Sequence, residues 1–173
     1  MLPGGWCVNI QKVLVILKPD CGQRGLDNEI VSILEQVGLV VLRKDARCLT
    51  EREVLFLYDE HKQTSTFPDL VSYMVSGQSM ILVMSGIDAV AKVTRLKGRT
   101  GSGKGIRGMY AENFIRNIIH SAETVYETNG EVVMFFPDED ISMNEKKVIF
   151  GLSGMTECGK STAGEYFRRV LRF

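Results

Sequence analysis

Residues 12–20 read KVLVILKPD, a short apolar run from Lys12 to Leu17 that stops at Lys18-Pro19-Asp20. Branched side chains in a run of this length predict a buried β-strand, and the proline marks its end. Residues 25–37 then place apolar side chains at helical spacing, which predicts a helix that the next glycine ends. Residues 39–49 return to strand character. The chain is therefore expected to begin with a strand, a helix and a second strand.

The rest of the chain alternates in the same way. Thr50-Glu51-Arg52-Glu53 is a capping box, which predicts the start of a helix. The other expected elements are helices over 67–74, 87–96, 112–117 and 123–128, and strands over 80–84 and 132–136. This order fits β-α-β-β-α-β with insertions. We therefore expect an α+β, ferredoxin-like fold, in which helices cover an antiparallel sheet.

Composition and charge narrow the class of protein. The 173 residues are 45% hydrophobic and 24% charged, which is typical of a globular chain. Because the 21 basic and 21 acidic residues cancel, we expect no nucleic-acid partner, and no run is apolar enough to cross a membrane. The four cysteines are scattered, which argues against a zinc cluster and indicates reduced thiols. With no signal peptide visible, we expect a cytoplasmic protein.

One loop is rich in both glycine and cations. Residues 97–108 read KGRTGSGKGIRG, with five glycines and four basic residues. Flexible backbone that exposes N–H groups beside cations is suited to cradle a phosphate, although a plain surface loop has the same composition. The loop also matches G-x-G-x-x-G. A dinucleotide site needs a strand before this motif, and here a helix precedes it, so we reject that interpretation.

The segment after the loop carries a candidate nucleophile. Phe114 to Ala122 reads FIRNIIHSA and places His120 beside an apolar run, with Glu131 eleven positions later. A lone histidine in this setting is often only a packed or surface residue. Neutral imidazole can nevertheless attack a phosphate near neutral pH, if a carboxylate fixes its tautomer and cations hold the phosphate oxygens. The sequence therefore permits phosphoryl transfer through histidine.

Four motifs occur in the same order as in a known family. Lys18-Pro19-Asp20, Gln23 to Leu26, Gly105 to Gly108 and Arg116 to His120 together resemble nucleoside diphosphate kinase, over about residues 12–139. The resemblance implies a phosphotransferase of ferredoxin-like fold that requires Mg²⁺, held through the nucleotide phosphates with no ligand from a protein side chain. It also implies a homo-oligomer (hexamer, tetramer or dimer) and ping-pong transfer of the γ-phosphate from a nucleoside triphosphate to a nucleoside diphosphate.

The same resemblance assigns roles to individual residues. It makes His120 the phosphorylated residue and Glu131 the partner of its far nitrogen. Lys18 and Asn117 match residues that hold the nucleotide sugar, Lys18 also lying near the reacting phosphate, and Tyr58 matches a tyrosine beside both the lysine and the histidine. The expected phosphate ligands are Thr100, Arg107 and Arg95, although Arg95 sits one position late and Thr94 takes the matching place.

Three departures from the family pattern concern binding and assembly. Where the family has an aromatic residue that stacks on the base, this chain has Thr66, with Phe67 beside it. Ala122 replaces a serine whose hydroxyl supports the glutamate. The loop between Thr100 and Arg107 is about four residues shorter than usual. An aromatic stack on the base is worth about 1–3 kcal/mol, and the hydrogen bond of the missing serine about 1 kcal/mol. We therefore expect an enzyme that is weaker but still active.

The last part of the chain carries a second phosphate motif. An acidic connector at 137–140 indicates a boundary, which gives a domain over 1–140 and a linker with a further segment over 141–173. Residues 154–161, GMTECGKS, match the P-loop pattern, with Gly159, Lys160 and Ser161 as phosphate ligands, between a strand at 147–151 and a helix at 161–171. Too few residues follow to complete a P-loop domain. Two other functions therefore stay open: a fragment of a P-loop small-molecule kinase, and a nucleotide-binding scaffold without turnover.

Overall fold

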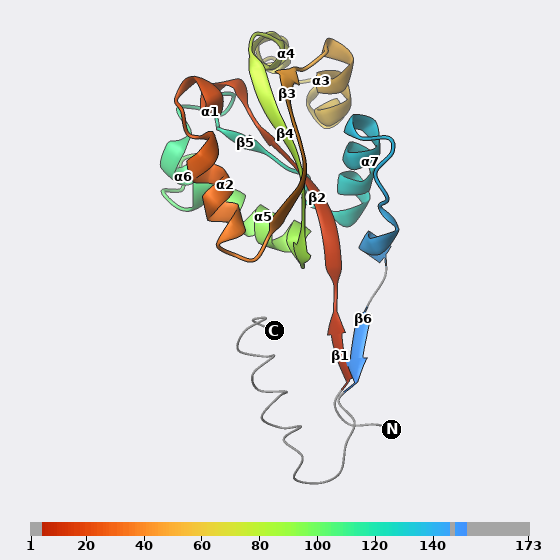
Figure 1. The fold of residues 1–173 in the computed structure, drawn as a ribbon. Coiled ribbons are helices and arrows are strands. Elements are labelled where there is room, and N and C mark those ends of the chain that lie inside the picture. The colour runs from red at the N-terminus through yellow and green to blue at the C-terminus, as the bar shows by residue number, and fades with distance from the viewer. Residues whose placement is uncertain (1–4, 146–147, 152–173) are drawn as a thin grey trace.

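The computed structural model describes residues 5–145 and 148–151. Four strands form an antiparallel sheet in the order β3-β4-β2-β5, where β2 is Ile10–Leu17, β3 Val40–Cys48, β4 Gln78–Ile87 and β5 Ile119–His120. The central pair is β2 and β4, the first and third of these four strands in chain order, and β3 and β5 lie at the edges (Figure 1). This is the strand order of the ferredoxin-like fold that the sequence predicts.

Strand β2 separates two apolar cores. Its side chains point alternately to opposite faces, because the side-chain period of a strand is two. Val13, Val15 and Leu17 belong to one core cluster, whereas Leu14 and Ile16 belong to the other. All five are fully buried. The near-continuous apolar run in the sequence therefore results from a strand that is covered on both faces.

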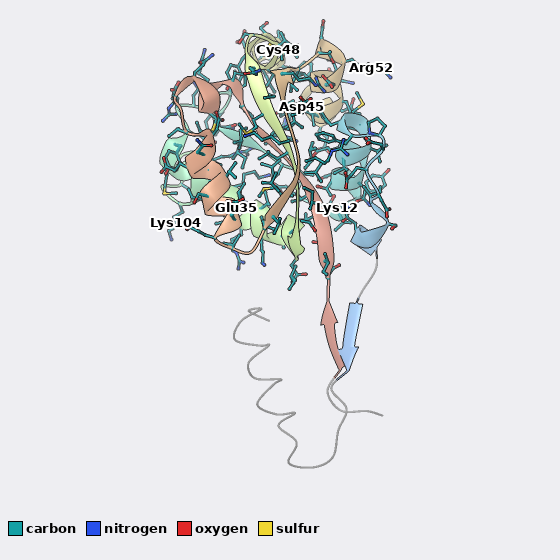
Figure 2. The ribbon with its side chains drawn as sticks, viewed as in Figure 1. Lys12, Glu35, Asp45, Cys48, Arg52 and Lys104 are labelled. Atoms are coloured by element: carbon teal, nitrogen blue, oxygen red, sulfur yellow. The ribbon has the colours of Figure 1, made fainter. Side chains whose placement is uncertain are left out.

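Helices form a layer on each face of the sheet (Figure 1). One layer contains α2 (Asp27–Glu35), α5 (Ala89–Lys97) and α6 (Gly105–Tyr110). The other contains α3 (Glu51–Leu57), α4 (Phe67–Val75) and α7 (Val125–Phe135). Charged side chains such as Glu35, Arg52 and Lys104 lie at the periphery of these layers (Figure 2). The short helix α1 (Pro19–Gln23) follows β2 directly, and Pro19 occupies its first position, where a missing N–H costs nothing.

Two expected elements are wrong. The predicted strand over 132–136 is the second half of α7, which begins at a capping box in which Thr124 accepts the N–H of Glu127. Val132 and Phe135 face the core at helical spacing. The predicted helix over 112–117 is irregular, because the Asn113 side chain accepts the N–H groups of Ile115 and Arg116 and so competes with helical bonding. The fourth strand is β5, and helix α6 begins inside the predicted loop at Gly105.

A second small sheet lies outside the main domain. Strands β1 (Gly5–Val8) and β6 (Val148–Gly151) pair antiparallel and project beyond the end of β2 (Figure 1). Before β6, the turn η2 (Ser142–Glu145) is attached to β2 by Asn144, whose amide bonds both the N–H and the C=O of Lys12, at 2.5 and 3.0 Å. The expected P-loop, its lysine and the helix at 161–171 lie outside the described residues, and the boundary near 140 stays a prediction. In the described ranges, no helix is long and apolar enough to cross a membrane.

Candidate active site

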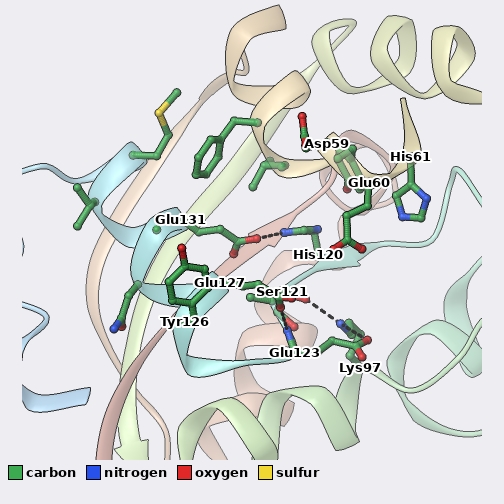
Figure 3. A pocket seen from close by; sticks show the side chains of 18 of the residues that line it. Asp59, Glu60, His61, Lys97, His120, Ser121, Glu123, Tyr126, Glu127 and Glu131 are labelled. Atoms are coloured by element: carbon green, nitrogen blue, oxygen red, sulfur yellow. Dashed lines mark hydrogen bonds and ion pairs between the residues drawn. The ribbon is translucent and has the colours of Figure 1, made fainter. Parts of the chain in front are cut away.

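An open pocket of about 1060 Å³ lies beside the short edge strand β5 (Figure 3). It is lined from one side by α7 and from the other by the ends of α3 and α5. Tyr58, Lys97, Arg107 and His120 line it with side chains that can donate a hydrogen bond to a phosphate or react with one, and Glu131 lines it beside His120. Predicted residues from four separate parts of the sequence therefore meet at one cavity.

His120 and Glu131 form the centre of this site. Nε2 of His120 lies 2.8 Å from Oε1 of Glu131, and both side chains are buried (Figure 3). A carboxylate accepts hydrogen bonds, so this contact selects the tautomer that carries its proton on Nε2. Within the described residues Nδ1 has no hydrogen-bond partner. The arrangement leaves an unprotonated nitrogen available to attack an electrophile.

Tyr58 packs between the histidine and a buried lysine. Its ring meets the His120 ring edge to face, with 5.2 Å between the centroids, and Nζ of Lys18 lies 5.5 Å from the tyrosine centroid. Its hydroxyl is buried, and no described residue is hydrogen-bonded to it. Burial raises the pKa of Tyr58, so the phenol stays protonated and can donate a hydrogen bond.

Lys18 is held in place by the segment that precedes β5. Its Nζ donates to Oδ1 of Asn117 at 2.6 Å and to the carbonyl of Ile115 at 3.3 Å. Burial, with a further contribution from the charge of Arg107, lowers the pKa of Lys18 from 10.5 to about 7. Pro19 follows Lys18 directly and begins α1, so the sequence places Lys18 at the junction between β2 and α1.

Arg107 comes from α6 and reaches across to β5. Its Nε and Nη2 donate to the carbonyl of Ile119 at 3.1 and 2.9 Å, which leaves Nη1 without a described partner. Glycines in the preceding loop permit this approach. Gly98 has φ 64°, and a Cβ there would lie 2.5 Å from the carbonyl oxygen of Lys104. The glycine-rich motif therefore serves close packing between α5 and α6.

Lys97 is a pocket residue that sequence reasoning missed. It is 3% exposed, and its Nζ donates to the Ser121 carbonyl at 2.7 Å and to Oε1 of Glu123 at 3.1 Å (Figure 3). Burial, and secondly the charge of Arg107, lowers its pKa. The sequence marks it only as one of four cations in the glycine-rich loop. A lysine in the last turn of a helix before glycine is also common for reasons of capping and dipole alone, so nothing singles Lys97 out.

Lys18 and Asn117 do not line this pocket, and four further predicted ligands lie apart from it. Arg95 is on the exposed face of α5, Thr100 is half-buried in the following loop, and Thr66 is an exposed residue at the start of α4. Phe67 is half-buried and packs on the core beneath α4. None of the four lines the pocket. Their roles as nucleotide ligands stay predictions.

Polar atoms without described partners lie near His120. Besides the Tyr58 hydroxyl, Oγ of Ser121 and Oε2 of Glu131 are buried and have no hydrogen bond among the described residues. A buried polar atom without a partner costs about 1–3 kcal/mol, so such a cluster indicates a site completed by water or ligand. The described part of the chain contains no group of three His, Cys, Asp or Glu side chains placed to hold a metal ion.

Comparison with known proteins assigns the family. The model of the family described as nucleoside diphosphate kinase matches residues 11–141. The chain belongs to the nucleoside diphosphate kinase family. Its relatives include a nucleoside diphosphate kinase from Saccharolobus islandicus (strain L.S.2.15 / Lassen #1), 35% identical over 140 residues that cover 76% of this chain and 99% of the relative. Another, from Ignicoccus hospitalis, is 34% identical over 136 residues, covering 76% and 92%.

Solved nucleoside diphosphate kinase structures share the fold. The enzyme from Halobacterium salinarum, solved in complex with CDP, superposes with a TM-score of 0.69 at 28% identity and covers 88% of this chain and 97% of its own. The apo enzyme from Encephalitozoon cuniculi gives 0.71 at 25% identity, with coverage of 78% and 96%. The family match does not extend to the P-loop motif, so nothing in these comparisons supports a P-loop kinase segment.

Proposed function

We propose that this member of the nucleoside diphosphate kinase family transfers the γ-phosphate of a nucleoside triphosphate to a nucleoside diphosphate through a covalent phosphate on Nδ1 of His120. The observation that carries this proposal is the 2.8 Å contact between Nε2 of His120 and Oε1 of Glu131. It leaves the other ring nitrogen unprotonated at the wall of a pocket large enough for a nucleotide.

The reaction has two matching halves. In the first, the Nδ1 lone pair forms a P–N bond to the γ-phosphorus while the bond to the bridging oxygen breaks, and the nucleoside diphosphate leaves with that electron pair. The positive charge that develops on the ring is stabilised by Glu131 behind it. In the second half, a terminal oxygen of another nucleoside diphosphate attacks the phosphorus and the P–N bond breaks. No net proton transfer by the protein is needed.

The cations and the tyrosine position the phosphate. Transfer of a phosphoryl group depends mainly on alignment and on neutralising charge on the equatorial oxygens. Arg107 has a free Nη1 on the pocket wall, and the ammonium of Lys18 lies behind the Tyr58 ring. The Tyr58 hydroxyl, which lacks a described partner, can donate to a phosphate oxygen and accept from the ammonium of Lys18. Asn117 holds Lys18 and contributes to the sugar subsite.

Mg²⁺ and self-association complete the proposal. The pocket offers cations for phosphate oxygens and no described cluster of metal ligands, a donor set that suits a metal ion bound through the nucleotide phosphates. There Mg²⁺ would neutralise phosphate charge. Homo-oligomerisation is supported by the edge strand β3, where Val40 and Leu42 are 60% and 45% exposed. We place the reaction in the cytoplasm, where the substrates would be free nucleoside tri- and diphosphates.

A labelling experiment tests the assignment. The protein is incubated with Mg²⁺ and ATP labelled at the γ-phosphate, and label on the protein is tested for lability in acid and then for chase into GTP by added GDP. The wild type is expected to take up acid-labile label and pass it on. His120→Ala should take up none. His61→Ala is the matched control, because His61 lines the same pocket without contacting Glu131.

The possible outcomes separate the candidate functions. Label that persists in His120→Ala overturns the assignment of the nucleophile. Nucleotide binding without any label on the wild type would favour a binding module that lost turnover. Activity that depends on Lys160 and ignores His120 would favour a P-loop kinase.

A further inference from the structure

We propose that Lys97 binds the outermost phosphates of the nucleotide beside Arg107, as a second phosphate cation of the site. The inference rests on the proposed function, because it assigns a ligand to the substrate of that reaction. Its basis is geometric. Lys97 is a buried lysine on the wall of the pocket that holds His120, and the mechanism above leaves it without a role.

Helix geometry explains why Lys97 and not Arg95 reaches the pocket. The two residues are two positions apart on α5, which corresponds to about 200° around a helix. Their side chains therefore leave the helix on nearly opposite sides. Lys97 is buried against β5, whereas Arg95 is exposed and does not line the pocket. Arg95, which lies one position after the place that the family pattern gives to an arginine, is thus turned away from the pocket. Lys97 is turned toward it.

Three cations lie close enough together to interact electrostatically, although five carboxylates also line the pocket: Asp59, Glu60, Glu123, Glu127 and Glu131. Lys18 and Lys97 are buried and Arg107 is half-buried. Burial lowers the pKa of each lysine, and the charge of Arg107 lowers it further. Glu131 is engaged with His120 and does not pair with any of them. Lys97 and Arg107 both line the pocket and repel each other, so they gain from a ligand with several negative charges, such as a di- or triphosphate.

The present partners of Lys97 leave room for such a ligand. One of its three N–H donors is fixed by the carbonyl of Ser121, the residue next to His120, and this bond holds the ammonium beside β5. A second donor meets Glu123, whose side chain is 68% exposed at the rim of the pocket. An exposed carboxylate can turn into solvent when a phosphate takes its place. The third donor has no described partner.

A purely structural role for Lys97 makes a different prediction. In that case its bonds to Ser121 and Glu123 would only fasten the connection between β5 and α7. Loss of the ammonium would then loosen the site for every nucleotide alike. A phosphate ligand instead discriminates by the number of phosphates, because nucleoside monophosphates do not reach the outer positions.

The first test compares nucleotide affinities in the full chain. Dissociation constants for AMP and ADP are measured by calorimetric titration with wild type, Lys97→Met, Lys97→Arg and, as matched control, Lys92→Met, which is on the same helix and does not line the pocket. We expect Lys97→Met to weaken ADP about 10- to 100-fold and AMP less than about threefold, since a lost charge-assisted hydrogen bond has this size. Lys97→Arg should restore most of the ADP affinity, and Lys92→Met should match the wild type. Equal losses for AMP and ADP, or no loss, overturn the proposal.

Glu123→Gln gives an independent test that does not remove the lysine. Without the competing carboxylate, ADP should bind about two- to tenfold more tightly than to wild type. In the Lys97→Met background the same substitution should change the ADP affinity less than twofold, because the two residues act as a pair. If Lys97→Met does not fold, unchanged ADP affinity in Glu123→Gln alone overturns the proposal. These are binding measurements, so they decide the role of Lys97 even if the labelling experiment fails.

Discussion

The carboxylate of Asp20 accepts the backbone N–H of Ile118 at 3.1 Å, although 98 positions separate the two residues. Ile118 has φ 70°, an unusual conformation for a branched side chain, and its carbonyl accepts the N–H of Lys18 at 2.8 Å. Both backbone groups of this strained residue are therefore held by the turn that follows β2. Because Ile118 lies two residues before His120, the Lys18-Pro19-Asp20 turn helps to fix where His120 enters the pocket.

Removal of the Asp20 carboxylate should lower both stability and activity. Asp20→Ala leaves the buried N–H of Ile118 unpaired, and the hydroxyl of Tyr73, which donates to the same carboxylate, also loses its acceptor. We expect the free energy of unfolding to fall by about 2–4 kcal/mol and labelling of His120 to slow at least about tenfold. Urea denaturation and the labelling rate measure the two effects.

Tyr73→Phe is the control for this prediction. It removes the tyrosine's bonds to Asp20 but leaves the bond from Ile118 to the carboxylate. It should cost about 1 kcal/mol and change the labelling rate little. Equal effects of the two substitutions on the labelling rate would contradict a specific role of Asp20 in holding Ile118.

The elements that the sequence predicted well are those with a local physical signal. The run at 12–17 and the capping box at Thr50 correspond to β2 and α3. The run at 132–136 was ambiguous, because a short apolar segment fits a strand or a helix, and the second capping box at Thr124 would have decided it. Strand β5 has no local signal: two residues become a strand because Ile16 pairs with His120.

The sequence predicts those site residues that belong to motifs in the family's order. It does not predict a residue whose place in the site depends on how a helix packs. His120, Glu131, Tyr58 and Arg107 meet at the pocket as the resemblance implies, although their roles stay predictions. Arg95 and Lys97 both lie near the end of α5, but the fold buries the side of the helix that carries Lys97 and exposes the side that carries Arg95. No pattern in the sequence distinguishes a lysine that caps a helix from one that enters a cavity.

Glu131→Gln should impair the chemical step more than binding. The side-chain amide can present its NH₂ group to Nε2 and so favour the tautomer with the proton on Nδ1, which cannot attack phosphorus. We expect the rate of His120 labelling to fall about 10²- to 10⁴-fold, by analogy with the loss of an orienting carboxylate in a catalytic triad, while the ADP dissociation constant changes less than about threefold.

The matched control for Glu131→Gln lies one helical turn earlier. Glu127→Gln keeps the capping box of α7 and does not touch His120. Its labelling rate should match the wild type. A fast Glu131→Gln enzyme would show that the carboxylate does not set the tautomer.

Lys18 should impose an alkaline limit on activity. Its pKa in the free protein is lowered to about 7, first by burial and secondly by Arg107, so the ammonium is lost as pH rises through that value. We expect kcat/KM to decline above about pH 7. The limit in kcat should lie at least one pH unit higher, because bound phosphates stabilise the charged form. Steady-state rates from pH 5.5 to 10 measure both limits.

Asn117→Ala tests whether Lys18 is the titrating group. The amide oxygen accepts from Nζ at 2.6 Å and so favours the charged form. Its removal should move the alkaline limit of kcat/KM to lower pH. A limit that stays in place would assign the titration to another group.

Ala122→Ser should strengthen the site. Oε2 of Glu131 is buried without a described partner, and Ala122 lies on the same pocket wall, where the resemblance implies a serine hydroxyl that supports this glutamate. A hydroxyl that donates to Oε2 satisfies a buried acceptor, which is worth about 1 kcal/mol. It also restrains the carboxylate that orients His120. We therefore expect a higher midpoint in urea and a labelling rate about two- to tenfold above the wild type. Ala122→Cys, of similar size but with a weak donor, should give little of either gain. If serine and cysteine behave alike, the gain comes from filling space, and the unpaired oxygen of Glu131 does not limit the reaction.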